Sequence, residues 1–295
     1  MSRQRKMATH LTPQTIDALI NQALAIEDEQ AQEAGALGFM ARAMVQATLP
    51  HRKTEGNEFT RVNGSYSMTI MAPSVIGLPY GTIPRLLLAW LTTEAVKTQH
   101  RELELGESLS GFMRELDIVP TGGRWGSITR LKDQTRRLFS SSITAVYEKG
   151  AGFAVINQAV ADRATLWWDA KAPEQAGLWK STVILSEQFF NEVIDRPVPI
   201  DMRAIKALKK SPMALDIYTW LTFRVSYLKR PTVIPWSSLA LQFGSNYAEL
   251  RNFKTAFLAE LKKVVLVYGQ VQAEATEQGL LVKPSLTHIS KKAAP

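Results

Sequence analysis

Hydrophobic residues recur at helical spacing in the N-terminal part of this chain. Thr12-Pro13 is typical of a helix start, because it places a capping side chain before a proline in the first turn. The apolar positions that follow predict a helix over 13–32. Two glycines interrupt the pattern, which then continues to Pro50. We therefore expect a helical hairpin or a kinked helix at this end of the chain.

The next stretch changes from helical spacing to alternation. Over 59–70, two alternating runs flank Asn63-Gly64, a strong hairpin dipeptide, and predict a two-stranded ribbon. An apolar helix over 84–96 and a short strand over 102–105 follow. This unit therefore mixes helices with strands.

A helix-turn-helix pattern comes next. Ser108 is expected to cap a short helix, a turn lies at 121–123, and a second helix covers 126–141. The alternating runs on either side of Gly150-Ala151-Gly152 predict a hairpin over 143–168. Because a hairpin after a helix-turn-helix is a wing, we predict a winged-helix domain here.

A second unit is expected beyond residues 170–178, whose composition, with Pro173 and Gly177, is typical of a linker. Pro212 is expected to kink or break the long helix of this unit. The predicted elements are strands at 181–185, 265–268 and 280–282, and helices at 187–194, 202–225, 237–241 and 247–264.

The two units repeat each other. Two matched residue pairs lie 130 positions apart and a third lies 122 positions apart, so the first copy has about eight extra residues in its turn. In each copy a long helix precedes a short helix, a basic helix and a hairpin. The matches are Trp90-Leu91 with Trp220-Leu221, Ser108-Leu109 with Ser238-Leu239, and Leu131-Lys132 with Phe253-Lys254.

These patterns predict an α+β fold of two tandem, pseudo-duplicated winged-helix domains with an N-terminal helical extension. The expected divisions are 1–57 for the extension, 58–175 for the first winged-helix domain and 176–295 for the second. The length of 295 residues is sufficient for two hydrophobic cores.

The charge of the chain favours a polyanionic partner. Its 35 Lys and Arg residues against 27 Asp and Glu give a net charge of +8. The absence of cysteine excludes disulfides, a thiolate nucleophile and cysteine-ligated metals. No apolar stretch approaches the ~20 residues of a membrane span, and the N-terminus lacks an apolar signal region. We therefore expect a cytoplasmic protein with no membrane contact.

The predicted helix over 126–141 has one apolar and one basic face. Arginine reads guanine and glutamine reads adenine, whereas lysine mostly contacts phosphates. The alternative is a solvated basic face without a ligand. The expected core stripe is Ile128, Leu131, Thr135, Leu138, Phe139 and Ser142. The DNA-binding candidates in and before this helix are Arg124, Ser127, Thr129, Arg130, Lys132, Gln134, Arg136 and Arg137.

The predicted helix over 247–264 has the same arrangement in the second unit. Two such helices would contact successive major grooves on one face of a duplex. Its expected core residues are Leu250, Phe253, Phe257, Leu261 and Val264. Its DNA-binding candidates are Arg251, Asn252, Lys254, Thr255 and Lys262.

The two predicted wings differ in charge. Lys149, beside the first hairpin tip, is a candidate for DNA contact. The second tip, over 274–278, is acidic and would repel phosphate. We expect it to point away from DNA or to meet another protein.

Catalytic chemistry has little support in the sequence. The four histidines are far apart, and no set of residues has the spacing of a metal site. Tyr66, Tyr80 and Tyr147 are expected to be structural. The seven tryptophans are expected to be core or interface residues rather than stacking platforms. We expect no enzymatic activity and no cofactor.

Six motifs are longer and more specific than these patterns. They are GLPYGTIPRLLLAWL at 77–91, LGESLS at 105–110, GGR at 122–124, RRLF at 136–139, SPMALDIYTWL at 211–221 and QFG at 242–244. They resemble the RepA-type replication initiators of bacterial plasmids. The resemblance covers about residues 49–268.

The resemblance implies an initiator with two winged-helix domains that binds double-stranded plasmid origin DNA at direct repeats, called iterons. It would help to open the duplex and recruit the host helicase with its loader or the host initiator, in the bacterial cytoplasm with the plasmid or nucleoid. It would form a homodimer through its first winged-helix domain and would have no catalytic centre. The alternatives are a winged-helix repressor that binds an operator, including that of its own gene, and an origin-nicking enzyme.

Overall fold

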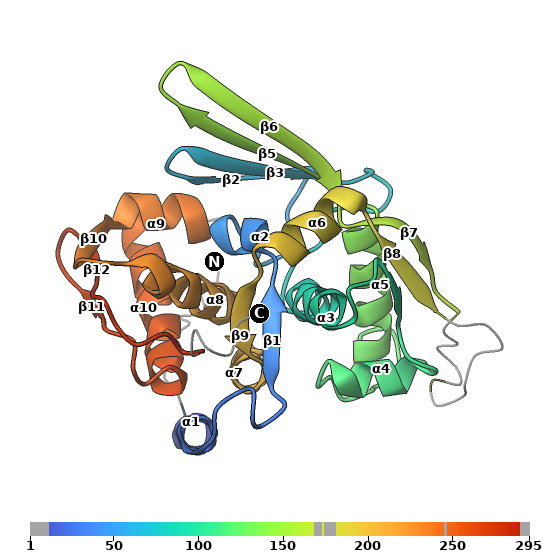
Figure 1. Ribbon diagram of the computed structural model, residues 1–295, viewed down its shortest axis with the longest axis horizontal. Helices are drawn as coiled ribbons and strands as arrows, with labels where there is room; N and C mark the ends of the chain where they lie inside the picture. Colours follow the sequence, from blue (N-terminus) through green and yellow to red (C-terminus); the bar gives the residue numbers. More distant parts are fainter. Residues whose placement is uncertain (1–11, 168–172, 174–180, 245–246, 290–295) are drawn as a thin grey trace, which may run out of the picture.

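The protein has an α+β fold, seen in a computed structural model that describes residues 12–167, 173, 181–244 and 247–289 (Figure 1). Its centre is an antiparallel ribbon of two strands far apart in the sequence, β1 (Leu37–Met40) and β9 (Val198–Asp201). The ribbon lies between two long helices, α3 (Ile83–Thr98) and α8 (Pro212–Tyr227). The N-terminal segment therefore joins two halves of the molecule.

This ribbon corrects the expected helical hairpin at the N-terminus. Of the helical pattern expected to continue from the two glycines to Pro50, only the short α2 (Arg42–Gln46) is present as a helix. The backbone at Gly38 approaches its neighbours closely, because a Cβ there would lie 2.6 Å from the sulfur of Met202. Leu37–Met40 is nearly all buried, so its apolar run has no alternation that would mark it as a strand.

The predicted first helix is confirmed as α1 (Pro13–Asp28), which ends earlier than expected. The Thr12 hydroxyl caps it by accepting a hydrogen bond from the Thr15 N–H. α1 packs against α7 (Met202–Leu208) and α10 (Leu250–Val267), both in the second half of the chain. The N-terminal segment is thus attached to the second unit as well as to the central ribbon.

The two halves have the same order of elements. In the first, α3 precedes β4 (Glu102–Glu104), α4 (Leu109–Glu115) and α5 (Ser127–Phe139). In the second, α8 precedes β10 (Thr232–Pro235), α9 (Trp236–Phe243) and α10. The predicted repeat therefore appears as two matching sets of three helices.

A small antiparallel sheet completes each set. The second sheet has the order β10-β12-β11, with β11 (Ala273–Ala275) and β12 (Gly279–Val282). The first has the order β4-β8-β7, with β7 (Ala161–Thr165) and β8 (Thr182–Leu185). In both sheets the last strand in the sequence lies in the middle.

The predicted wing of the first unit belongs to a different sheet. Its strands are β5 (Ser142–Lys149) and β6 (Gly152–Ala159), which extend the ribbon of β2 (Glu58–Asn63) and β3 (Tyr66–Met71). The predicted ribbon at Asn63-Gly64 is confirmed. The resulting sheet has the order β2-β3-β5-β6, and its β5–β6 hairpin projects from the top of the molecule (Figure 1). The equivalent of the second unit's β11–β12 hairpin is therefore β7–β8.

The expected boundary between the two domains, at 175/176, falls between two strands of one sheet. Except for Pro173, the predicted linker core at 170–178 lies outside the described residues. The strands that flank it, β7 and β8, pair with each other, with Thr165 opposite Thr182. A boundary at 175/176 would therefore pass through one sheet, and α6 (Glu187–Asp195) is the first element beyond that sheet.

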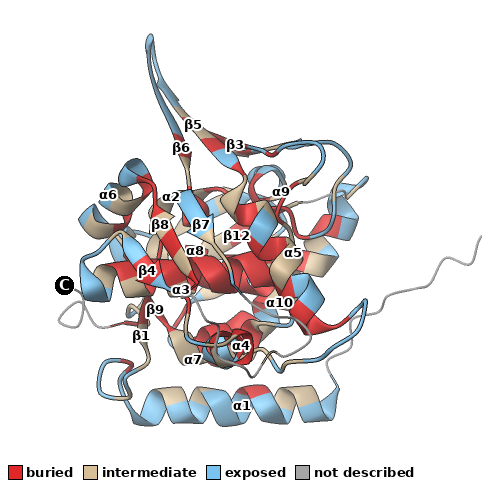
Figure 2. Cartoon of the chain, turned by 90° about the vertical axis from the view of Figure 1, so that its right-hand side faces the viewer, coloured by how far each residue is buried: buried red, intermediate tan, exposed pale blue. Residues whose placement is uncertain are grey.

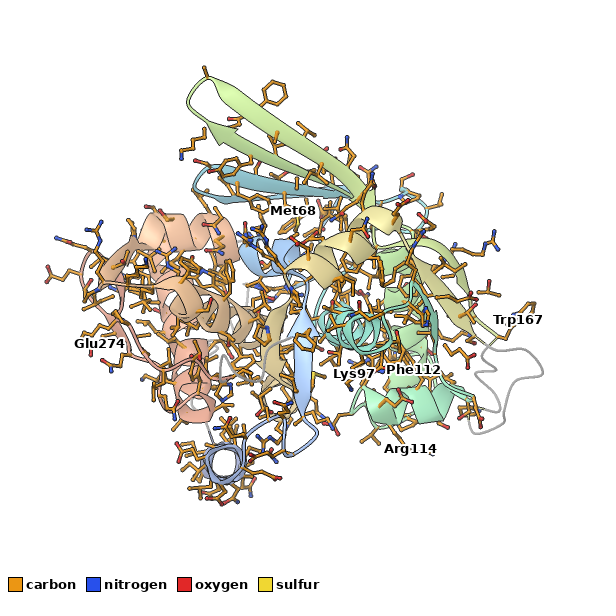
Figure 3. The ribbon with its side chains drawn as sticks, viewed as in Figure 1. Met68, Lys97, Phe112, Arg114, Trp167 and Glu274 are labelled. Carbon is orange, nitrogen blue, oxygen red and sulfur yellow. The ribbon has the colours of Figure 1, made fainter. Side chains whose placement is uncertain are left out.

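The core surrounds α3 and α8, which are buried along most of their length (Figure 2). On the first side, Phe112 of α4 packs edge-on against Trp90 of α3, with ring centroids 5.0 Å apart (Figure 3). Ser108 caps α4 as predicted, because its hydroxyl accepts the Gly111 N–H at 3.1 Å. The predicted break at Pro212 is also confirmed, since α8 begins there.

A polar cluster is buried between the two long helices. Asp216 of α8 accepts hydrogen bonds from Arg85 Nε and Nη2 of α3, each at 2.6 Å. His51 Nε2 lies 2.7 Å from the same carboxylate. Arg85 also donates to the carbonyl oxygens of Leu49 and Pro50. One ion pair thus connects both helices and the segment that follows α2.

Candidate nucleic-acid interface

The turn before α5 is held by a glycine and two reciprocal hydrogen bonds. A Cβ at Gly126, the N-cap residue, would lie 2.2 Å from the Thr121 carbonyl oxygen. The Thr121 N–H donates to Ser127 Oγ at 2.8 Å, and the Ser127 N–H donates to Thr121 Oγ1 at 2.9 Å. These contacts fix the position at which α5 begins.

The inner face of α5 agrees with most of the predicted stripe. Ile128, Leu131, Thr135 and Leu138 are buried. Phe139 is half-buried, and Ser142 is exposed on β5 rather than on the helix. Phe139 still packs against the core, so Ser142 alone departs from the expected stripe.

Thr129, Arg130 and Arg136 lie on the exposed face of α5. Arg124 is exposed in the preceding turn, with its guanidinium 5.2 Å from the Trp125 ring centroid. Lys132 is half-buried at the edge of this face. These positions leave two arginines of α5 available to a ligand, as the sequence predicts.

Three predicted base readers of α5 are corrected. Ser127 and Gln134 are each only 4% exposed, and Gln134 Oε1 accepts the Tyr80 N–H at 2.8 Å. Arg137 is half-buried and pairs with Asp133 at 2.8 Å, with its guanidinium over the Tyr80 ring. Gln134 and Arg137 hold the loop around Tyr80 against the helix, and Ser127 is bonded to the Thr121 turn, so none of the three is presented as a base reader.

α10 presents the second set of candidate residues. Phe253, Phe257, Leu261 and Val264 are buried as predicted, whereas Leu250 is exposed because it begins the helix. The helix also continues to Val267, so the strand predicted at 265–268 is wrong.

The outward residues of α10 form a polar, basic face. Arg251, Asn252, Thr255 and Lys262 are exposed. Lys254 is half-buried, with its ammonium 4.8 Å from the centroid of the Trp236 ring. Arg251 and Asn252 are thus accessible to a ligand, while Lys254 is partly used in packing.

The two helices share one side of the molecule. Figure 1 shows α5 and α10 on either side of the central ribbon, and Figure 2 shows both in the half of the molecule remote from α6. Lys149 is exposed at the end of the β5–β6 hairpin, which projects away from both helices. The structure therefore places the α5 and α10 candidates on one side of the molecule, separated by its central elements, and leaves Lys149 apart from them.

Among the tryptophans that the structure describes, two are exposed, contrary to the expectation that all are core or interface residues. Trp125 is 82% exposed in the turn before α5, and Trp167 lies exposed at the end of β7 (Figure 3). Trp220 and Trp236 are buried as expected. Trp125 lies where the first copy has its extra residues, and this insertion was the sequence signal that could have marked it as a surface residue.

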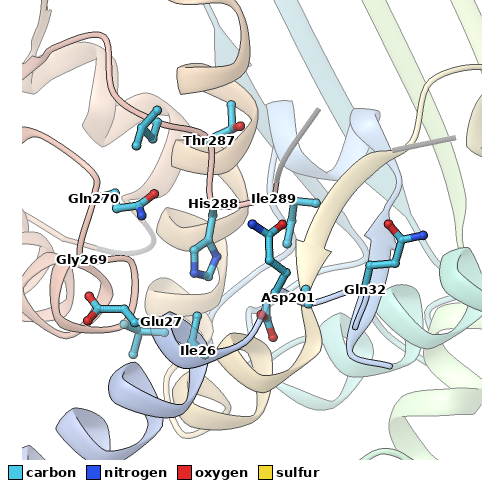
Figure 4. Close-up of a pocket in the computed structure, with 13 residues that line it drawn as sticks. Ile26, Glu27, Gln32, Asp201, Gly269, Gln270, Thr287, His288 and Ile289 are labelled. Carbon is cyan, nitrogen blue, oxygen red and sulfur yellow. The ribbon is translucent and has the colours of Figure 1, made fainter. Parts of the chain in front are cut away.

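A cavity of about 330 Å³ lies at the other end of α10, between α1 and the C-terminal segment (Figure 4). His288 faces it, with Nδ1 2.7 Å from the Tyr218 hydroxyl. Among the described residues, nothing bonds to His288 Nε2. Burial lowers the pKa of His288 to about 4, so the ring is neutral at physiological pH.

Two further properties concern the described part of the chain. No three His, Asp or Glu side chains within it come together as a possible metal site. None of its helices is long and apolar enough to span a bilayer.

Comparisons with known proteins indicate fold and family. No curated protein matches the sequence. A crystal structure of domains 2 and 3 of RctB, as selenomethionine derivatives, is similar with a TM-score of 0.50 over 80% of this chain and 95% of that one. At 13% identity this similarity shows the shared fold alone. The family model of plasmid-encoded RepA proteins matches residues 78–237, more than half of the chain. The chain therefore belongs to the RepA family of plasmid replication initiators.

Proposed function

We propose that the two matching sets of helices and strands are winged-helix domains. The first would extend from α3 to β8 and the second from α8 to β12. The support is that each set has three helices and a three-stranded antiparallel sheet whose last strand lies in the middle. The wings would be β7–β8 and β11–β12. Most of the turn between β7 and β8 lies outside the described residues.

The proposed activity is sequence-specific binding to direct repeats at the origin of the plasmid that encodes the chain. The observation that carries it is the placement of α5 and α10 on one side, with two exposed arginines on α5 and one on α10. Two recognition helices so placed contact successive major grooves of one duplex. Arg130 and Arg136 would serve the first groove, and Arg251 with Asn252 the second.

Binding to the origin would lead to local opening of the duplex and to recruitment of the host helicase, with its loader or the host initiator. Both steps rest on the family, and neither requires a covalent step by this chain. The net charge of +8 supports contact with both strands of a duplex.

The proposal includes a homodimer formed through the first domain. β6 is an edge strand of the four-stranded sheet, and its backbone is free to pair with a second strand. Phe153, Val155 and Ile156 on this strand are exposed, with Phe153 at 76%. Monomeric proteins seldom leave such an apolar edge open, which favours a second copy there.

Footprinting of the purified protein on supercoiled origin DNA, with permanganate to detect unpaired thymines, tests this function. Protection of spaced direct repeats, with unpaired bases in adjacent A·T-rich DNA, is expected. Protection of one inverted repeat without unpaired bases would instead indicate a repressor. Strand cleavage that requires a divalent metal would indicate a nicking enzyme.

A further inference from the structure

A short basic segment lies between the two candidate recognition helices. Arg52 and Lys53 are exposed immediately after the buried His51. Together with Arg130 of α5 and Pro212 at the start of α8, they line an open cavity of about 360 Å³. Asp133, the acidic residue of this cavity, is already paired with Arg137. The cavity therefore has an excess of positive charge.

The same segment extends towards α10. Tyr247, just before that helix, packs its ring against Phe253 with centroids 5.8 Å apart. Burial raises the pKa of Tyr247, and the nearby charge of Arg52 opposes that rise. Arg52 thus lies near Tyr247, which packs against α10 through Phe253, while the cavity joins Arg52 to α5.

The backbone of this segment is held rigidly from both sides. His51 Nε2 lies 2.7 Å from Asp216, and Arg85 Nη2 donates to the Leu49 carbonyl oxygen at 2.7 Å. The Pro50 carbonyl oxygen also accepts the Gly81 N–H at 3.1 Å. Because these anchors come from α3, α8 and the loop before α3, the two basic side chains start from a fixed position.

A duplex on this side would present a specific groove to the segment. When two helices occupy successive major grooves on one face, the minor groove between them faces the protein. Minor grooves carry an enhanced negative potential where they are narrow, and they attract inserted arginine and lysine. We propose that Arg52 and Lys53 bind the minor groove of the DNA between the two major grooves contacted by α5 and α10. This inference rests on the proposed function.

The test uses the full chain with both side chains removed, Arg52→Ala with Lys53→Ala. The matched control is Lys229→Ala with Arg230→Ala, because these residues are also adjacent, exposed and basic. They follow the C-terminal end of α8, which is about 24 Å from Pro212 for a helix of this length. Both double variants lose the same charge, so only position distinguishes them.

Hydroxyl-radical footprinting on a linear duplex of the plasmid origin, together with a salt titration of binding, provides the readouts. The wild type and the control should protect the centre of each repeat as well as its two flanks. The Arg52/Lys53 variant should lose the central protection and keep the flanks. Log affinity should also decrease less steeply with log salt, so that the magnitude of the slope is smaller by about 2. Unfolding temperatures should agree among the three proteins.

Two results would count against the inference in different ways. Unchanged central protection and an unchanged salt slope in the Arg52/Lys53 variant would overturn it and leave the proposed function intact. No protected repeat with the wild type would overturn the proposed function itself.

Discussion

Arg85 of α3 and Asp216 of α8 form an ion pair in which both residues are buried and two nitrogens of the arginine contact two oxygens of the aspartate. Burial alone would raise the pKa of Asp216, but Arg85 and His51 outweigh it and hold that pKa below its ordinary value. The carboxylate is therefore charged when the protein is folded, and Arg85 depends on it for compensation.

Replacing Asp216 with Asn should lower the free energy of unfolding by about 3–5 kcal/mol, because it leaves Arg85 buried without a counter-charge. Denaturant titration measures the loss. The matched control is Asp162→Asn, which breaks the exposed Arg101–Asp162 pair of the same 2.6 Å length and should cost at most about 1 kcal/mol. Equal losses in the two variants would show that burial of the Arg85 pair has no consequence.

The stability of the fold should decrease with acid between pH 6.5 and 4. Burial lowers the pKa of His288 from 6.5 to about 4, so in this range the unfolded chain binds a proton that the folded chain does not. The contribution of this pKa shift to the free energy of unfolding is fully present above pH 6.5. About 3 kcal/mol of that free energy is lost as the pH falls to 4, at about 1.4 kcal/mol per pH unit. Burial also lowers the pKa of His51, which acts in the same direction.

His288→Gln should therefore reduce, without abolishing, the difference in unfolding free energy between pH 7 and pH 4.5. The exposed His100 provides the control variant, His100→Gln, which should retain the wild-type difference. A His288 variant with the full wild-type difference would mean that this ring is not the group that titrates.

Arg130→Ala and Arg251→Ala should each weaken specific binding by about 1–3 kcal/mol, since each removes one candidate base contact. The footprint should become shorter at one end with Arg130→Ala and at the other end with Arg251→Ala. Arg230→Ala, an exposed arginine beyond α8, serves as the control and should leave the footprint complete. A full-length footprint with either variant would remove that helix from the DNA interface.

Ile156→Asp should convert a dimer to a monomer, because it places a charge on the exposed apolar edge at β6. Light scattering after size-exclusion chromatography measures the mass, and the unfolding temperature should stay unchanged. Val75→Asp, at a still more exposed valine outside the sheet, is the control and should remain dimeric. A wild type that is monomeric at every concentration would contradict the proposed dimer.

Most of the elements were predictable because their signals are local. Ser108 and Ser211 cap helices through their own side chains, and Pro212 starts a helix where a proline is tolerated. The repeat of α3 in α8 was visible because Trp90-Leu91 recurs as Trp220-Leu221. Such signals depend on residues a few positions apart, and the sequence contains them directly.

The errors arose where a distant segment determines the structure. Leu37–Met40 becomes a strand because it pairs with Val198–Asp201, and no local pattern reveals that partner. Gln134 lies on the outward side of α5 by periodicity, yet the loop around Tyr80 covers it. The hairpin of β5 and β6 is present as predicted, but its pairing with β3 places it in the sheet of β2 and β3, and no local strand pattern reveals that partner.

The β1–β9 ribbon helps to set the distance between the two candidate recognition helices, α5 and α10. It lies between α3 and α8, so the register of Leu37 opposite Asp201 fixes one half of the molecule against the other. A slip of two residues would move the halves by about 6.6 Å, close to the rise of two base pairs. If α5 and α10 bind DNA as proposed, the spacing of their contacts within one repeat depends on the four mostly buried residues of β1.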